Sequence, residues 1–249
     1  ASVDDFAKLA ITWQTSGYFS AVEGVMNSNF APQVPSTNIT LSADINLSGT
    51  GLTGLTKDRQ PKEQAGVNEN NHSFTATLNG NGHTISLAVG EPYGMRGDSE
   101  VGVTSAGNGK IYRHGRLGLF AAINGATVSD VTINGSMKFD NQSNVDAGAL
   151  AGVKVGGDTS LTSVKFGTGV RYESTNKDGY VHVGSIIGGM SGVGSLKIGN
   201  RESPSIIKAN IVSKAPESGV TCVGGAVGYV ASDCLPSAAG KTVEVGGLN

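Results

Sequence analysis

Apolar and polar residues alternate with a period of two from Asn38 onward. In the segment "NITLSADINLSG" the apolar positions are Ile39, Leu41, Ala43, Ile45 and Leu47. Successive side chains of a β-strand point to opposite faces, so this period predicts one half-buried strand. The later segment "SFTATLNGNGHTISLAV" predicts two strands that meet at a glycine-rich corner. We therefore expect a β domain to begin at residue 38.

The first residues follow a helical spacing instead. The apolar positions with this spacing are Phe6, Leu9, Ala10 and Trp13. Ser2 stands three places before Asp5, a pattern typical of a helix N-terminus, so we predict a short capped amphipathic helix. Residues 1–37 are interpreted as this capping helix and a linker. Residues 38–249 are interpreted as a β-repeat domain whose end, "TVEVGGLN", lies inside a repeat.

Four glycine-plus-apolar blocks recur along the chain. They begin at Gly118 ("GLFAA"), Gly148 ("GALAG"), Gly184 ("GSIIG") and Gly224 ("GGAVG"), at spacings of 30, 36 and 40 residues. Such spacings are typical of stacked-coil proteins, and a variable stretch precedes each new block. We predict that each unit is one turn of an all-β solenoid built from two or three short strands, with aliphatic side chains inside and glycines at the corners.

Composition and charge narrow the function classes. Glycine accounts for 38 of 249 residues, and only 15% of residues are charged, with a formal net charge of −2. This balance provides no basic surface for a polyphosphate backbone, so nucleic acid is not an expected partner. The sequence contains no run of ~18 apolar residues, so no membrane span is expected. The chain begins with Ala1 and is expected to be part of a longer polypeptide.

The strand and glycine motifs resemble a known repeat family. Asp44, Ile45 and Leu47, then "FTATLNGNGHTI", then Gly118 to Ile133 resemble the motifs of bacterial GLUG proteins. Two positions depart from that pattern: Ala121 replaces the second glycine, and Asp130 stands where asparagine is usual. The resemblance implies a right-handed parallel β-helix, similar to pectin lyase in architecture, in a secreted or surface-attached bacterial protein. Members of the family include adhesin-like proteins and non-catalytic parts of surface proteases.

Candidate catalytic groups are sparse. The aspartates that could form a catalytic pair are Asp130, Asp146, Asp158 and Asp178, and because they do not recur at one place in the repeat we interpret them as solvated turn residues. The histidines are His72, His83, His114 and His182, and their spacing fits no metal motif. His83 is expected to pack or to form a hydrogen bond. The tripeptide Arg96 to Asp98, which some integrins read, is interpreted as a chance occurrence.

The two cysteines leave two alternatives open. Cys222 and Cys234 are twelve positions apart, which suits a loop-closing disulfide if the protein is exported. The other alternative is a pair of unbonded thiols.

Taken together, these features favour a non-enzymatic module at the bacterial cell surface, an adhesin or a structural stalk. Its expected partner is a host glycan or an extracellular-matrix protein, bound through the variable loops 50–72, 90–115 and 134–147. No catalytic residue, metal or cofactor is predicted, and no ligand-binding residue is assigned. The first alternative is a polysaccharide lyase or hydrolase on the same fold. The second is an accessory segment of a large surface protease.

Overall fold

The structure is a computed structural model. It describes residues 4–6, 8, 37–47, 73–89, 103–104, 111–112, 114–139, 144–167, 169–173, 178–208, 210–214, 218–231 and 243–245. Nearly all of the regular structure in these residues is β-strand, and all but two of the strands form four parallel sheets that we number I to IV. The all-β, parallel character expected from the sequence is confirmed.

The predicted "NGNG" corner joins a strand of sheet I to a strand of sheet II. Sheet I consists of β1 (Ile39–Thr40), β3 (Thr77–Asn79), β9 (Thr127–Ser129), β13 (Thr159–Thr162), β18 (Leu196–Ile198) and β23 (Val243–Val245). Sheet II consists of β2 (Ile45–Asn46), β4 (Thr84–Val89), β10 (Thr132–Phe139), β14 (Lys165–Phe166), β15 (Gly169–Glu173), β19 (Ile206–Ile207) and β20 (Ile211–Lys214). Strand β10 pairs with β14 through its first half and with β15 through its second half.

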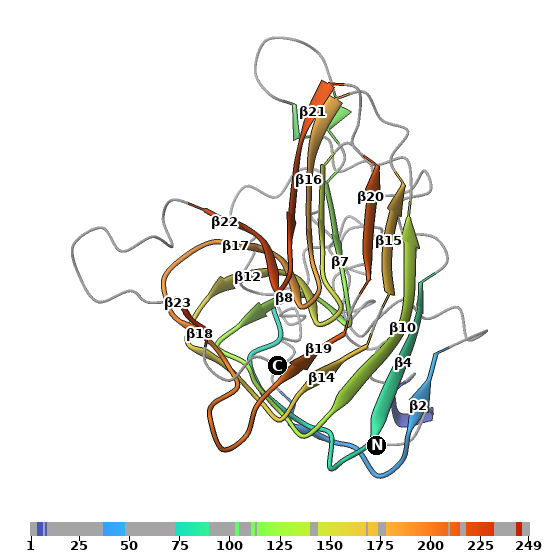
Figure 1. Cartoon of the computed structure of the whole chain (residues 1–249), viewed down its shortest axis with the longest axis vertical. Coiled ribbons are helices and arrows are strands. Elements are labelled where there is room, and N and C mark those ends of the chain that lie inside the picture. The colour runs from blue at the N-terminus through green and yellow to red at the C-terminus, as the bar shows by residue number, and fades with distance from the viewer. Residues whose placement is uncertain are drawn as a thin grey trace, which may run out of the picture.

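Sheets III and IV flank the glycine blocks. Sheet III consists of β7 (His114–Leu117), β11 (Asn144–Ala147), β16 (Asp178–Gly184) and β21 (Ser218–Gly224). Sheet IV consists of β8 (Phe120–Asn124), β12 (Ala151–Gly156), β17 (Ile187–Met190) and β22 (Val227–Val230). Strands β5 (Val103–Thr104) and β6 (Ile111–Tyr112) form a separate antiparallel pair. In Figure 1, β16 and β21 of sheet III run beside β15 and β20 of sheet II.

Each glycine block lies where the chain turns from sheet III into sheet IV. The strands that follow the blocks pair in parallel, with Phe120 beside Ala151, Ala151 beside Ile187 and Ile187 beside Val227. A Cβ on Gly118 would lie 2.5 Å from the carbonyl oxygen of Gly148, so these turns are in direct backbone contact. The blocks therefore lie side by side, as their recurrence predicts.

The number of strands in each repeat differs from the prediction. From β8 to β11 the chain passes through sheets IV, I, II and III in turn, which makes four strands rather than two or three. The additional strands come from stretches that we interpreted as loops: residues 134–139 belong to β10, residues 144–147 to β11, and residues 114–115 to β7. These polar stretches become strands because their backbones pair with neighbouring repeats. Loop 50–72 lies outside the described residues.

The interior is filled by aliphatic stacks. In sheet I, Ile39, Leu78, Val128, Leu161 and Ile198 are in register and are at most 3% exposed. A second stack in sheet II joins Ile45, Ile85, Ile133 and Phe166. Burial of such side chains contributes on the order of 1.5–3 kcal/mol each before entropy is counted. The stacks explain why apolar residues recur at the same place in each repeat.

Two details at the N-terminal side correct or limit the predictions. The single strand expected over 38–47 is two strands, β1 and β2, separated by a bend at which Ala43 is exposed. The bend is required because the segment crosses from sheet I to sheet II. Asp4 to Phe6 and Lys8 are helical, and Phe6 is fully buried in the core. Apart from Thr37, the rest of the predicted helix and linker lies outside the described residues.

Candidate functional site

A row of polar residues crosses sheet III. Register places Arg116 of β7 beside Asp146 of β11, Asp146 beside His182 of β16, and His182 beside Cys222 of β21. In-register neighbours in parallel strands share a face, so these four side chains leave sheet III on the same side. The flanking residues of β11 and β16 are Val145, Ala147, Val181 and Val183, all buried in the hydrophobic core. The polar row therefore lies on the face directed away from that core.

Asp146 and His182 form a buried pair within this row. Nδ1 of His182 lies 2.8 Å from Oδ1 of Asp146, and the two side chains are only 10% and 7% exposed. A carboxylate accepts hydrogen bonds, so Nδ1 carries the proton and donates it. The imidazole also stacks on the ring of Tyr229 in β22, with a centroid distance of 4.3 Å and an interplanar angle of 11°. The interpretation of Asp146 as a solvated turn residue is thus wrong.

The burial of this pair follows from glycines in sheet IV. A Cβ on Gly152 would lie 2.7 Å from the backbone nitrogen of Leu117, and one on Gly228 would lie 2.6 Å from that of Val183. Gly188 has the same role: a Cβ on Gly188 would lie 2.6 Å from the carbonyl carbon of Asp146. Only glycine permits this approach of the two sheets. Sheet IV consequently covers a face of sheet III that would otherwise be exposed.

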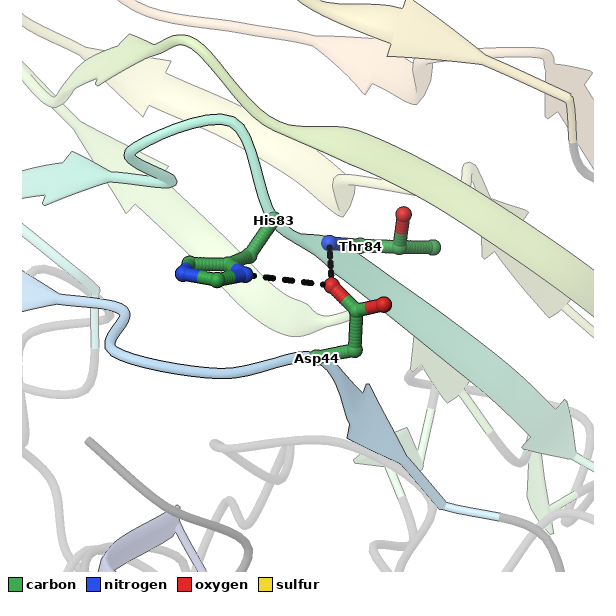
Figure 2. Close-up of polar contacts among 3 residues, drawn as sticks. All are labelled: Asp44, His83 and Thr84. Atoms are coloured by element: carbon green, nitrogen blue, oxygen red, sulfur yellow. Dashed lines mark hydrogen bonds and ion pairs between the residues drawn. The ribbon is translucent and has the colours of Figure 1, made fainter.

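A second Asp–His pair occupies the corner between sheets I and II. Asp44 precedes β2, and Figure 2 shows its carboxylate reaching the start of β4. Oδ1 of Asp44 accepts the backbone N–H of Thr84 at 2.8 Å and lies 3.2 Å from Nδ1 of His83. The Thr84 N–H lowers the pKa of the Asp44 carboxyl below its ordinary value of 3.8; burial opposes this effect, and the His83 hydrogen bond and charge reinforce it. His83 has the hydrogen-bonding role expected of it.

The other predicted aspartates are not brought together with Asp146. Asp130 is exposed and has a φ of 49° at the corner between β9 and β10. Asp158 lies between β12 and β13, where it accepts the N–H and the hydroxyl of Ser195, each at 2.8 Å. The Ser195 N–H, followed by the hydroxyl, lowers the pKa of Asp158. The turn interpretation therefore holds for Asp130 and Asp158. Asp178 is the first residue of β16.

Several predicted residues remain untested. His72, Arg96 to Asp98 and Cys234 lie outside the described residues, while His114 begins β7. Cys222 is half-buried, and because Cys234 lies outside the described residues, the disulfide and the pair of unbonded thiols both stay predictions. Within the described ranges, no group of three or more His, Cys, Asp or Glu side chains is arranged to hold a metal ion.

The cluster of Arg116, Asp146, His182, Cys222 and Tyr229 was not found from the sequence. Its chemical features are an oriented imidazole, a carboxylate and a neighbouring thiol. None of the helical residues in the described part of the chain forms a helix long and apolar enough to cross a membrane. Comparison of the chain with protein-family models, with curated proteins and with solved structures gave no match.

Proposed function

We propose that this chain is a right-handed parallel β-helix of the GLUG type that serves as a non-enzymatic module at the bacterial cell surface. The observation that carries the proposal is the in-register parallel pairing of successive repeats around aliphatic stacks. Parallel strands in one sheet are joined by right-handed crossovers in ~98% of cases, which favours the right-handed form of the coil.

The variation in repeat length supports a role in display. Residues aligned in sheet IV are separated by 31 residues from Phe120 to Ala151 but by 40 from Ile187 to Val227, yet both pairs are in register. The frame thus accepts insertions without losing its pairing. Binding surfaces commonly consist of variable connections on such a rigid frame.

One connection is much longer than its equivalents. Sheet II passes to sheet III through residues 140–143, 174–177 and 215–217 in three repeats, but through residues 90–113 between β4 and β7. The long connection includes the antiparallel pair of β5 and β6. We propose that this connection contacts the partner, a host glycan or an extracellular-matrix protein.

A binding array tests this function. The chain would be applied to glycans and matrix proteins beside a variant in which residues 90–113 are replaced by the four residues 140–143. We expect one ligand class to bind the chain and not the variant, with both retaining the same far-UV circular dichroism. Equal binding by both would refute the role of the connection.

The competing function is cleavage of a polysaccharide. Asp130 and Asp158 lie at separate corners and Asp146 lies in the buried pair, an arrangement that favours binding over acid–base cleavage. Incubation with polysaccharides, monitored for new reducing or unsaturated ends, distinguishes the two. Turnover that is abolished by Asp146→Asn or Asp158→Asn in a folded chain would replace the proposed function with an enzymatic one.

A further inference from the structure

The last described strands of sheets II, III and IV expose apolar side chains. Of the five large apolar side chains that are exposed in the described part of the chain, four lie on β20, β21 and β22: Val212, Val220, Val223 and Tyr229. In Figure 1 these strands have the orange and red colours of the C-terminal part. The exposed apolar groups therefore gather where the series of paired repeats ends.

The same positions are buried one repeat earlier. Val183 of β16 is fully buried, whereas Val223, beside it in β21, is 51% exposed. Ile187 of β17 is also fully buried, whereas Val227, beside it in β22, is only half-buried. The earlier strands have a described neighbour on both sides, and β21 and β22 have one on a single side. The last strands thus present the surface that every earlier repeat presents to the next repeat.

The edge of β21 has no feature that opposes pairing with another strand. Its sequence, "SGVTCVG", contains neither a charged residue nor a proline, and β22, "VGYV", is also uncharged. β21 pairs with β16 in unbroken register over its seven residues. Soluble proteins usually protect an exposed edge with charges, proline or a bulge. A regular, uncharged edge of this length favours the addition of a further strand.

The first strands of sheets I, II and IV do not offer such a surface. Ile39 of β1 and Ile45 of β2 are at most 3% exposed, and Phe6 is fully buried in the same core. Phe74 covers β8, where its ring stacks on that of Phe120 with a centroid distance of 4.2 Å. A second copy of this chain therefore offers its last strands for pairing rather than its first ones.

We propose that the exposed strands β20, β21 and β22 form an interface between two copies of this chain, joined end to end about a two-fold axis. Each repeat already packs on a repeat of the same chain, and the interface continues that packing from one copy to the other. With both cores on the same side of the joined sheet III, the two-fold axis places β21 antiparallel to its copy. Each copy uses this end once, so the assembly closes as a dimer.

This interface goes beyond the proposed display role. A dimer presents the connection of residues 90–113 twice, so its binding to a repetitive surface gains from avidity. The binding array tests the connection, and the oligomeric state tests the interface. Failure of either proposal leaves the other in place.

Sedimentation velocity at increasing protein concentration, in the presence of a reducing agent, tests the interface. We expect the mass to rise from that of one chain, 25.2 kDa, to that of two. Val223→Lys and, separately, Val220→Lys should each raise the dissociation constant at least about tenfold, because the dimer would bury an unpaired ammonium group from each copy. Both variants should keep the far-UV circular dichroism of the parent, since both valines are exposed in the single chain.

Val193→Lys is the matched control. Val193 is 65% exposed but lies at the corner between β17 and β18, away from the proposed interface, so this variant should associate like the parent. The proposal is overturned if the chain stays a monomer at every concentration or forms larger assemblies in place of a dimer. It is also overturned if Val193→Lys weakens association as much as Val223→Lys.

Hydrogen exchange provides a readout that needs no variant. In the unmodified chain, the backbone amides of residues 218–224 should exchange more slowly at high than at low protein concentration, because pairing with the second copy protects that edge. The amides of β1 should exchange at the same rate at both concentrations. Equal exchange of residues 218–224 at the two concentrations overturns the proposal.

Discussion

Two Asp–His pairs with similar sequence separation occupy very different surroundings. Asp44 and His83 are 39 residues apart and Asp146 and His182 are 36 residues apart, and both pairs link strands of successive repeats. At the corner of sheets I and II the side chains are 72% and 31% exposed, and the two atoms are 3.2 Å apart. On sheet III the exposures are 7% and 10%, and the distance is 2.8 Å.

The difference shows that packing, rather than residue type, decides what such a pair does. Solvent screens the exposed pair, and the main partner of Asp44 is a backbone N–H rather than the imidazole. The buried pair is shielded by sheet IV, so loss of one member leaves a polar group without water to replace it. The first pair closes a corner, and only the second holds its imidazole buried between a carboxylate and an aromatic ring.

The largest expected effect comes from the glycine that lets sheet IV cover the buried pair. Gly188→Ala would place a Cβ against the backbone of Asp146 and Ala147, which cannot move without disrupting sheet III. We expect a loss of about 3 kcal/mol or more in the free energy of unfolding, measured by urea denaturation.

Gly82→Ala is the matched control at the exposed corner. Gly82 has a φ of 81°, and no atom lies within 4 Å of the place that a Cβ would occupy, so only backbone strain opposes the substitution. A cost of about 1–2 kcal/mol is expected. Equal losses for the two variants would mean that the close approach of sheets III and IV does not limit stability.

Removal of a carboxylate compares the pairs directly. Asp146→Ala leaves His182 buried without its acceptor and should cost about 3 kcal/mol in the free energy of unfolding. Asp146→Asn retains an acceptor oxygen and should cost less. Asp44→Ala should lower the melting temperature only slightly, and a larger loss there than for Asp146→Ala would contradict the comparison.

Acid should remove the contribution of the exposed pair. The pKa of Asp44 in the folded chain lies below the ordinary 3.8, so its contacts stabilise the fold above that value. Their contribution is lost as the pH falls through the folded-state pKa. The melting temperature of the wild type should therefore exceed that of Asp44→Asn at neutral pH, and the two should converge once the pH has fallen below the folded-state pKa of Asp44. A difference that persists in acid would show that the Asp44 charge is not responsible.

The smallest effect is expected from His83→Gln. The Thr84 N–H is the largest cause of the lowered pKa of Asp44, with the imidazole a lesser one. Titration of the Asp44 carboxyl carbon by NMR should show a small upward change in its pKa, to a value still below 3.8. A rise to the ordinary value would make the imidazole the main partner of Asp44.

The sequence by itself determined the β character of the chain and the positions that stack. Apolar residues alternate with polar ones at Ile39, Leu41, Ile45 and Leu47, and all four side chains are buried. The sequence could show this because the two-residue period of a strand is a local property of the chain. The glycine blocks recur because every turn from sheet III into sheet IV has the same steric requirement.

Only the tertiary structure decided which polar residues become neighbours. Partners in sheet IV are 31 to 40 residues apart, and the separation changes with each insertion. A count along the chain therefore cannot place Asp146 beside His182 or His182 beside Cys222. Their burial also depends on sheet IV, whose approach is set by glycines in a different strand. Long-range register and the packing of one sheet on another thus fixed the cluster that local patterns could not show.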